Sequence, residues 1–202
     1  GFAGPPGAGK SSLLREVVRR IRQGGERAAI VASDPVSPLT GGALLGDRYR
    51  MAGVADDPGV FFRSIAHRGA AGEPCPAACL AADILDSGGF PWIFLETVGT
   101  GQADVHALRG AHLKVFVHAP DGGDQIQMLK AGLQEVADLH VVGKCDRPGA
   151  RAWAVELEGA LSGSRGGTAR VLALSAATGE GVDALVQELR ASREAFRKEH
   201  IP

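Results

Sequence analysis

The sequence has little of several features that would point to a partner or a compartment. Its 22 Lys and Arg residues nearly balance its 23 Asp and Glu residues, and the two signs are interspersed, so the chain carries no electrostatic footprint for nucleic acid or an anionic membrane. It has no apolar run of membrane-spanning length and no signal-peptide pattern. We therefore expect no nucleic-acid or membrane partner and a cytoplasmic location, unless a segment before Gly1 carries an organellar address.

The chain also has few cysteines, no internal repeat and no low-complexity tract. Three cysteines are an odd number and do not make a disulfide framework, which favours a reducing compartment. A length of 202 residues suits one domain, and a domain of that size buries roughly 70% of its unfolded surface. We expect a single domain over residues 1–202.

The opening segment, "GFAGPPGAGKSS", contains G-x-x-x-x-G-K-S, the pattern of a phosphate-binding loop. Glycine lets such a loop expose successive backbone amides to phosphate oxygens. We expect Lys10 to reach the terminal phosphates and act in catalysis, and Ser11 to bind Mg²⁺. Apolar residues then recur at helical spacing from Leu13 to Ile21, so a helix begins where the motif requires one. The nucleotide-binding residues predicted in this loop are Gly4, Gly7, Ala8, Gly9, Lys10, Ser11 and Ser12.

The position of this loop at the start of the chain is unusual. A phosphate loop normally follows a buried strand, but only Gly1, Phe2 and Ala3 precede Gly4, and there is no initiator Met. We interpret the chain as truncated at the N-terminus, with most of the first strand missing.

Apolar runs alternate with helical patterns along the rest of the chain. Runs that are apolar throughout are typical of parallel strands buried on both faces. Amphipathic segments from Gln125 to Ala137 and from Ala150 to Leu161 predict helices, and "SGSRGGT", Ser162 to Thr168, predicts a surface loop. The alternation predicts a three-layer α/β/α sandwich with a mostly parallel sheet. The predicted strands are "RAAIVAS", "PWIFLET", "LKVFVHA", "DLHVVGK" and "ARVLALS".

Acidic residues follow two of these runs. Ligands bind at the carboxyl ends of parallel strands, where a carboxylate and water hold Mg²⁺ beside the γ-phosphate. "ETVGTGQAD" supplies Glu96 as a catalytic and metal-binding acid, with the Gly99 amide as a γ-phosphate sensor. "SDPVSPLTGGALLGDRYRM" supplies Asp34 and Asp47 for the magnesium shell, although either acid could instead cap a helix or be a solvated charge.

Two later segments have the residues for recognition of a guanine base. Asp146 in "GKCD" can accept from both the N1–H and the 2-amino group of guanine, and the stem of Lys144 can shield that pair from water. Ser175 and Ala176 in "SAATGEG" can present backbone amide to the guanine carbonyl oxygen. A K-x-D triplet means little by itself, so this interpretation depends on the phosphate loop.

Taken in order, these motifs resemble the MeaB/ArgK type of phosphate-loop GTPase, the chaperones associated with methylmalonyl-CoA mutase. The similarity runs from Gly1 to about Leu189 and is carried above all by "SPLTGGALLGDR", "DPGVFFRSIAHRG", "ETVGTGQAD" and "GGDQIQMLKAG". The resemblance implies a slow GTPase that docks on an adenosylcobalamin-dependent acyl-CoA mutase, gates cofactor loading and protects the mutase. It also implies a homodimer whose C-terminal dimerisation arm is absent from this chain.

The resemblance assigns Asp124, Gln127 and Lys130 to a switch that communicates with the mutase. In our mechanistic hypothesis, Glu96 and Gly99 report loss of the γ-phosphate to the segments around Arg63 and Lys130. For the segment from Gly122 to Lys130, a plain loop and helix turn is the alternative. Gly143 departs from the family, which has an Asn there whose side chain ties the base loop to the phosphate loop. Its loss is expected to weaken guanine binding by about 1 to 3 kcal/mol if a buried hydrogen bond is left unmade.

Three other functions compete with this hypothesis. Cys75 and Cys79 would share one face of a helix, with His67 as the nearest third ligand, as in a metal-delivery GTPase of hydrogenase or urease maturation. Buried cysteines that pack a helix are the simpler explanation. The chain could also be a degenerate nucleotide-binding module without turnover, or a small-molecule phosphotransferase, although it has no basic cluster for an acceptor.

Overall fold

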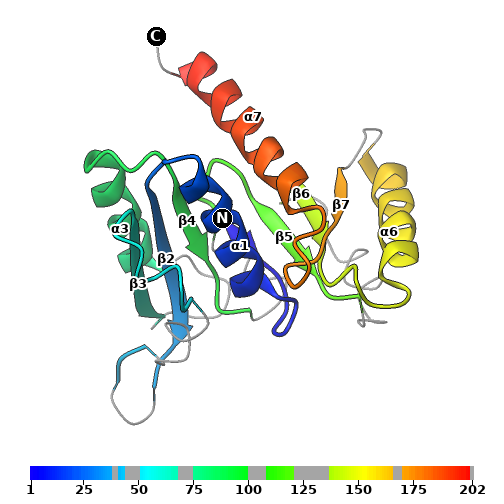
Figure 1. The fold of residues 1–202 in the computed structure, drawn as a ribbon, viewed down its shortest axis with the longest axis horizontal. Helices are drawn as coiled ribbons and strands as arrows, with labels where there is room; N and C mark the ends of the chain where they lie inside the picture. The colour runs from blue at the N-terminus through cyan, green and yellow to red at the C-terminus, as the bar shows by residue number, and fades with distance from the viewer. Residues whose placement is uncertain are drawn as a thin grey trace.

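The computed structural model describes residues 1–37, 41–43, 51–67, 75–99, 108–120, 137–165 and 170–200. Within these residues, seven strands form one parallel sheet in the order β3-β2-β4-β1-β5-β6-β7 (Figure 1). The predicted α/β sandwich with a parallel sheet is confirmed. The strands are β1 (Phe2–Ala3), β2 (Ala28–Pro35), β3 (Val60–His67), β4 (Ile93–Glu96), β5 (Val115–His118), β6 (Leu139–Val142) and β7 (Val171–Ala173).

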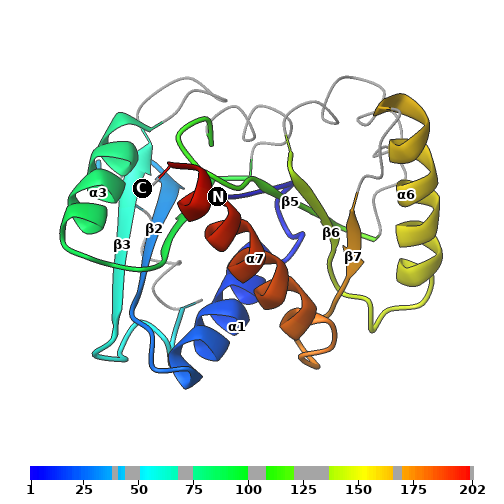
Figure 2. The same cartoon turned by 90° about the horizontal axis from the view of Figure 1, so that it is seen from above.

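Helices cover both faces of this sheet. Helices α1 (Lys10–Gln23) and α7 (Val182–His200) lie together on one face, and α3 (Pro76–Ser87) and α6 (Ala150–Arg165) lie on the other (Figure 2). The apolar side chains predicted for the first helix are those that α1 buries: Leu13, Leu14, Val17, Val18 and Ile21. None of the described helices is both long and apolar enough to cross a membrane.

The short β1 strand is the centre of the sheet. Phe2 pairs with Glu96 of β4 on one side and with Val115 of β5 on the other. Strands β2 to β4 lie to one side of β1 and β5 to β7 to the other, so the strand order reverses at β1. In open α/β sheets such a reversal creates a crevice at the carboxyl ends of the strands, and the loop that follows β1 enters it.

The edge strand β3 has no predicted counterpart. Its burial alternates at first, with Phe61 and Arg63 exposed, and only β2 flanks it. The prediction relied on continuous apolar runs, which are a signature of strands covered on both faces, and "VFFRSIAH" is not one.

One predicted loop differs in part from the structure, and one predicted helix lies mostly outside the described residues. The loop predicted from Ser162 to Thr168 is wrong in its first part, because α6 continues to Arg165. The end of a helix frays readily, and small polar residues do not mark its last turn well. Most of the helix predicted from Gln125 to Ala137 lies outside the described residues.

Candidate nucleotide-binding site

The loop after β1 has the backbone of a phosphate cradle. Gly4, Gly7 and Gly9 have φ angles of 143°, 74° and 96°, which side chains on L-residues rarely allow. A β-carbon on Gly4 would lie 2.2 Å from the Val117 carbonyl oxygen, so glycine is required there by space as well. Open space surrounds the corresponding positions on Gly7 and Gly9, and Gly9 is the N-cap of α1. This geometry is the one that anion sites at helix N-termini use.

Lys10 is folded back onto this loop. Its ammonium group is buried and donates to the carbonyl oxygens of Gly4, at 2.8 Å, and Pro5, at 3.2 Å. Gly99 lies directly against it, since a β-carbon on Gly99 would be 2.6 Å from Lys10 Nζ. The structure therefore brings together the predicted catalytic lysine and the predicted γ-phosphate sensor.

Ser11 and Glu96 meet at the first turn of α1. The Ser11 hydroxyl donates to Glu96 Oε1 at 2.5 Å, and Glu96 is buried at the end of β4. A hydroxyl and a carboxylate in contact beside a phosphate loop are hard oxygen ligands of the kind that Mg²⁺ takes. These two residues fit a bound Mg²⁺ ion.

Asp34 lies near the end of the neighbouring strand, β2. It is buried at the end of β2, two residues beyond Ala32, which is in register with Glu96. The Ser64 hydroxyl of β3 donates to Asp34 Oδ2. Sequence analysis missed Ser64, because only the pairing of β2 with β3 reveals that it faces Asp34. Asp47, the other predicted acid, lies outside the described residues.

The loops after β6 and β7 line a cavity of about 220 Å³ that is open to solvent. Lys144 and Asp146 line it, as do Ser175 and Ala176, so the four residues predicted to read the base are together. A hydrogen bond from the Ser175 hydroxyl is the main cause that lowers the pKa of Asp146, and a backbone hydrogen bond is the second cause. The Asp146 carboxylate is therefore ionised at neutral pH. Ser175 is buried, and its Oγ accepts from the amide of Ala177 at 3.2 Å.

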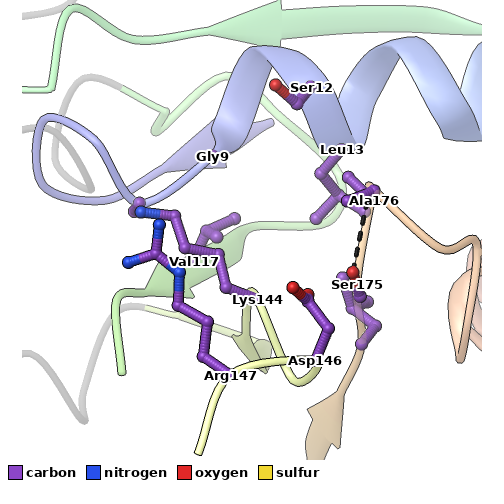
Figure 3. Close-up of a pocket in the computed structure, with 13 residues that line it drawn as sticks. Gly9, Ser12, Leu13, Val117, Lys144, Asp146, Arg147, Ser175 and Ala176 are labelled. Atoms are coloured by element: carbon purple, nitrogen blue, oxygen red, sulfur yellow. Dashed lines mark hydrogen bonds between the residues drawn. The ribbon is translucent and has the colours of Figure 1, made fainter. Parts of the chain in front are cut away.

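The arrangement in the cavity suits a nucleotide. The carboxylate of Asp146 lies between Lys144 and Ser175, and the side chains of Lys144 and Arg147 extend toward the phosphate loop (Figure 3). Sequence analysis missed Arg147 as a residue of this cavity, although its position next to Asp146 in the chain could have indicated it. A base in this cavity and phosphates at the loop would belong to one ligand. Gly9, Ser12 and Leu13 form the wall shared with that loop; the remaining lining residues are Ala8, Val117, Gly143, Leu174 and Ala177.

Several predicted residues lie elsewhere. Arg63 is exposed on β3, where its backbone pairs with β2, and its side chain makes no hydrogen bond or ion pair with another described residue. The switch residues Asp124, Gln127 and Lys130 lie outside the described residues.

The cysteine pair is at the start of α3. Cys75 is the buried N-cap, and Cys79 lies one turn later. Burial first, then the Cys75 thiol and the Asp83 carboxylate, raise the pKa of Cys79, so its thiol stays protonated at neutral pH. No group of three or more His, Cys, Asp or Glu residues in the described part of the chain is placed to hold a metal ion, and His67 adds no third ligand there.

Comparison with known proteins adds independent information. The family model described as "Methylmalonyl Co-A mutase-associated GTPase MeaB" matches residues 1–200. A putative GTPase of Pyrococcus horikoshii is 50% identical over 161 residues, which cover 80% of this chain and 51% of that protein. The mitochondrial methylmalonic aciduria type A homolog of mouse is 33% identical, over 94% of this chain and 48% of its own length. The chain thus spans about half the length of these curated relatives.

Solved structures show the same fold. The crystal structure of an LAO/AO transport system kinase has a TM-score of 0.70 at 24% identity, and covers 98% of this chain and 60% of its own. HypB from Helicobacter pylori in complex with nickel has a TM-score of 0.72 at 16% identity, over 96% of this chain and 86% of its own. At these identities the likeness concerns the fold alone.

Proposed function

Because this chain belongs to the family of methylmalonyl-CoA mutase-associated GTPases, we propose that it is the GTP-binding domain of such a protein. It binds GTP and GDP with Mg²⁺ and hydrolyses GTP slowly. One observation carries this proposal: a phosphate loop with its lysine, a Ser11–Glu96 contact and a cavity lined by Lys144 and Asp146 share one edge of the sheet.

Each residue has a distinct role in this proposal. Lys10 exchanges its bonds to the Gly4 and Pro5 carbonyls for bonds to the β- and γ-phosphates, and so neutralises charge that develops in the transition state. The amides of the phosphate loop bind the phosphates. Asp146 accepts from guanine, and Lys144 covers the base.

Magnesium would be held by Ser11, Glu96 and Asp34, with Asp47 as a further ligand. When bound, Mg²⁺ supplies positive charge to the β- and γ-phosphate oxygens. Glu96 lies at the end of β4 and leads to Gly99, which contacts Lys10, so loss of the γ-phosphate changes the surroundings of both residues. No described residue at the site is an evident base for the attacking water, which accounts for slow hydrolysis by the isolated chain.

The proposed partner is an adenosylcobalamin-dependent acyl-CoA mutase, and the nucleotide state gates its cofactor loading. Support comes from the family model and from the mouse relative, both named for methylmalonyl metabolism. Arg63, Asp124, Gln127 and Lys130 are the proposed coupling residues, and Arg63 is exposed on an edge strand where a partner can reach it. We further propose a homodimer and, from the three free thiols, a cytoplasmic location.

Titration calorimetry with GDP, GTP and ATP, each with Mg²⁺, tests this function. Tighter binding of both guanine nucleotides than of ATP is expected, because ATP lacks the two donors that Asp146 accepts. A folded protein that binds none of the three would be a degenerate module. Zinc or nickel that is retained after dialysis, and lost in a Cys75→Ser, Cys79→Ser variant, would favour metal delivery instead.

A further inference from the structure

The base loop and the phosphate loop touch each other at Gly143. This residue directly follows β6, and its amide donates to the His118 carbonyl at the end of β5 at 3.0 Å. A β-carbon on Gly143 would lie 2.8 Å from the carbonyl oxygen of Ala8 and 3.7 Å from Val117 Cγ1. Real β-carbons essentially never approach a backbone oxygen as closely as 2.8 Å, so the two loops are in backbone contact with no side chain between them.

Neither loop can retreat freely from this contact. On the phosphate side, the Ala8 amide donates to the Pro5 carbonyl at 3.3 Å, and Ala8 is buried beside Gly9, the N-cap of α1. A displaced Ala8 carbonyl would therefore move the turn that presents amides to phosphate.

On the base side, hydrogen bonds hold the loop to the end of β7. The Cys145 amide donates to the Leu174 carbonyl at 3.0 Å, and the Leu174 amide donates to the Val142 carbonyl at 3.0 Å. Gly143 lies between Val142 and Lys144, so a shift at Gly143 is passed directly to Lys144 and then to Asp146, which line the cavity.

We propose that Gly143 is a positioning residue that sets the distance between the base-binding and phosphate-binding halves of the site by close backbone contact. The proposal rests on the proposed nucleotide-binding function and deepens it. It also reverses the expectation from sequence: an Asn at this position does not restore a missing tie between the loops, because its β-carbon forces them apart. In this chain, glycine at position 143 is what lets the base loop and the phosphate loop lie at their present distance.

The experiment measures the Kd of GDP with Mg²⁺ for the parent, Gly143→Asn and Gly143→Ala. We expect Gly143→Asn to raise Kd by about tenfold or more, since overpacking against backbone commonly costs enough for such a change. Gly143→Ala carries the same β-carbon with no further atoms and raises Kd less. Gly110→Ala is the matched control, because open space surrounds that position, and it leaves Kd unchanged.

A second control separates binding from stability. Leu157→Ala removes a fully buried side chain of α6, away from the cavity, so it lowers the thermal midpoint without changing the Kd of folded protein. Equal or tighter binding by Gly143→Asn overturns the proposal. So does unfolding of both Gly143 variants without nucleotide, because Gly143 then serves the fold alone. A parent that binds no GDP instead refutes the proposed function itself.

Discussion

At the phosphate end of the site the chemically important side chains already have protein partners, whereas at the base end they face an open cavity. Lys10 is bonded to carbonyls of its own loop, Ser11 to Glu96, and Asp34 to Ser64. Lys144 and Asp146 line a cavity that the protein does not fill, although Asp146 also accepts a hydrogen bond from Ser175. Ligand binding must therefore exchange hydrogen bonds at one end and mainly occupy space at the other. The base end is preorganised, and the phosphate end has to rearrange.

The largest effect is expected from a substitution at the phosphate end of the site. Lys10→Ala removes the positive charge that α1 extends to the loop, so GTP hydrolysis should fall by at least about 100-fold, in line with the loss of a transition-state charge contact. Phosphate release measures this change. Lys198→Ala, at an exposed position near the end of α7, is the control and should keep the parent rate. A Lys10→Ala protein that hydrolyses GTP as fast as the parent contradicts the mechanism.

The next largest effect is expected from a substitution at the base end of the site. Asp146→Asn replaces an acceptor by a donor, so GDP binding should weaken by about 100-fold and xanthosine diphosphate, which has a carbonyl where guanine has its amino group, should bind better than GDP. Calorimetry gives both Kd values. Asp86→Asn, at an exposed position of α3, should change neither. An unchanged preference for GDP would show that Asp146 does not read the base.

A smaller effect is expected from a substitution that changes Mg²⁺ binding at the phosphate end and leaves the base end unchanged. Ser64 holds Asp34, a proposed magnesium ligand, and Ser64→Ala leaves that carboxylate without this partner. We expect the Mg²⁺ concentration for half-maximal GTP hydrolysis to rise by about tenfold, at the lower end of what supporting contacts of metal ligands commonly contribute. GDP binding in EDTA should not change, and Ser87→Ala on α3 should affect neither quantity. Equal loss of GDP binding with and without Mg²⁺ would mean that Ser64 acts only on the fold.

The smallest expected effect concerns pH: the preference for GDP over inosine diphosphate should stay constant over a wide pH range. The Ser175 hydrogen bond lowers the pKa of Asp146, so its carboxylate stays ionised above that lowered value and protonates only as pH falls through it. The ratio of GDP to inosine diphosphate affinity, in which the phosphate titrations cancel, should be flat from about pH 8 down to about pH 5, well above the ordinary range of Asp. In Ser175→Ala the ratio should begin to fall at a higher pH. A parent ratio that already declines near neutral pH would contradict this pKa direction.

Much of this site could be predicted from sequence because its parts are local. The phosphate loop and α1 are adjacent in the chain, so the G-x-x-x-x-G-K-S spacing alone predicts where Gly4, Lys10 and Ser11 lie. The five predicted strand runs are also correct, since strands covered on both faces are apolar throughout. The contact between Lys10 and Gly99, however, joins segments far apart in sequence.

What sequence could not predict depends on packing between elements. Ser64 faces Asp34 only because β3 pairs with β2 in one particular register. The close contact of Gly143 with Ala8 depends on the distance between two loops, and an absent side chain leaves no pattern to detect. The resemblance to the family suggested a missing Asn there, whereas in this structure a β-carbon at Gly143 would lie 2.8 Å from the Ala8 carbonyl oxygen.

The central position of β1 has a consequence for how the nascent chain acquires this fold. Phe2 leaves the ribosome well before its partners Glu96 and Val115, because helices and strands on one side of the sheet are synthesised in between. Closure of the sheet is thus a long-range event with a high loop-closure cost. Until then Phe2 and Ala3, which are fully buried in the finished sheet, are exposed to solvent and to other apolar chains. The loop that follows β1 is thus synthesised before β4 and β5, and it is fixed only when these strands pair with β1.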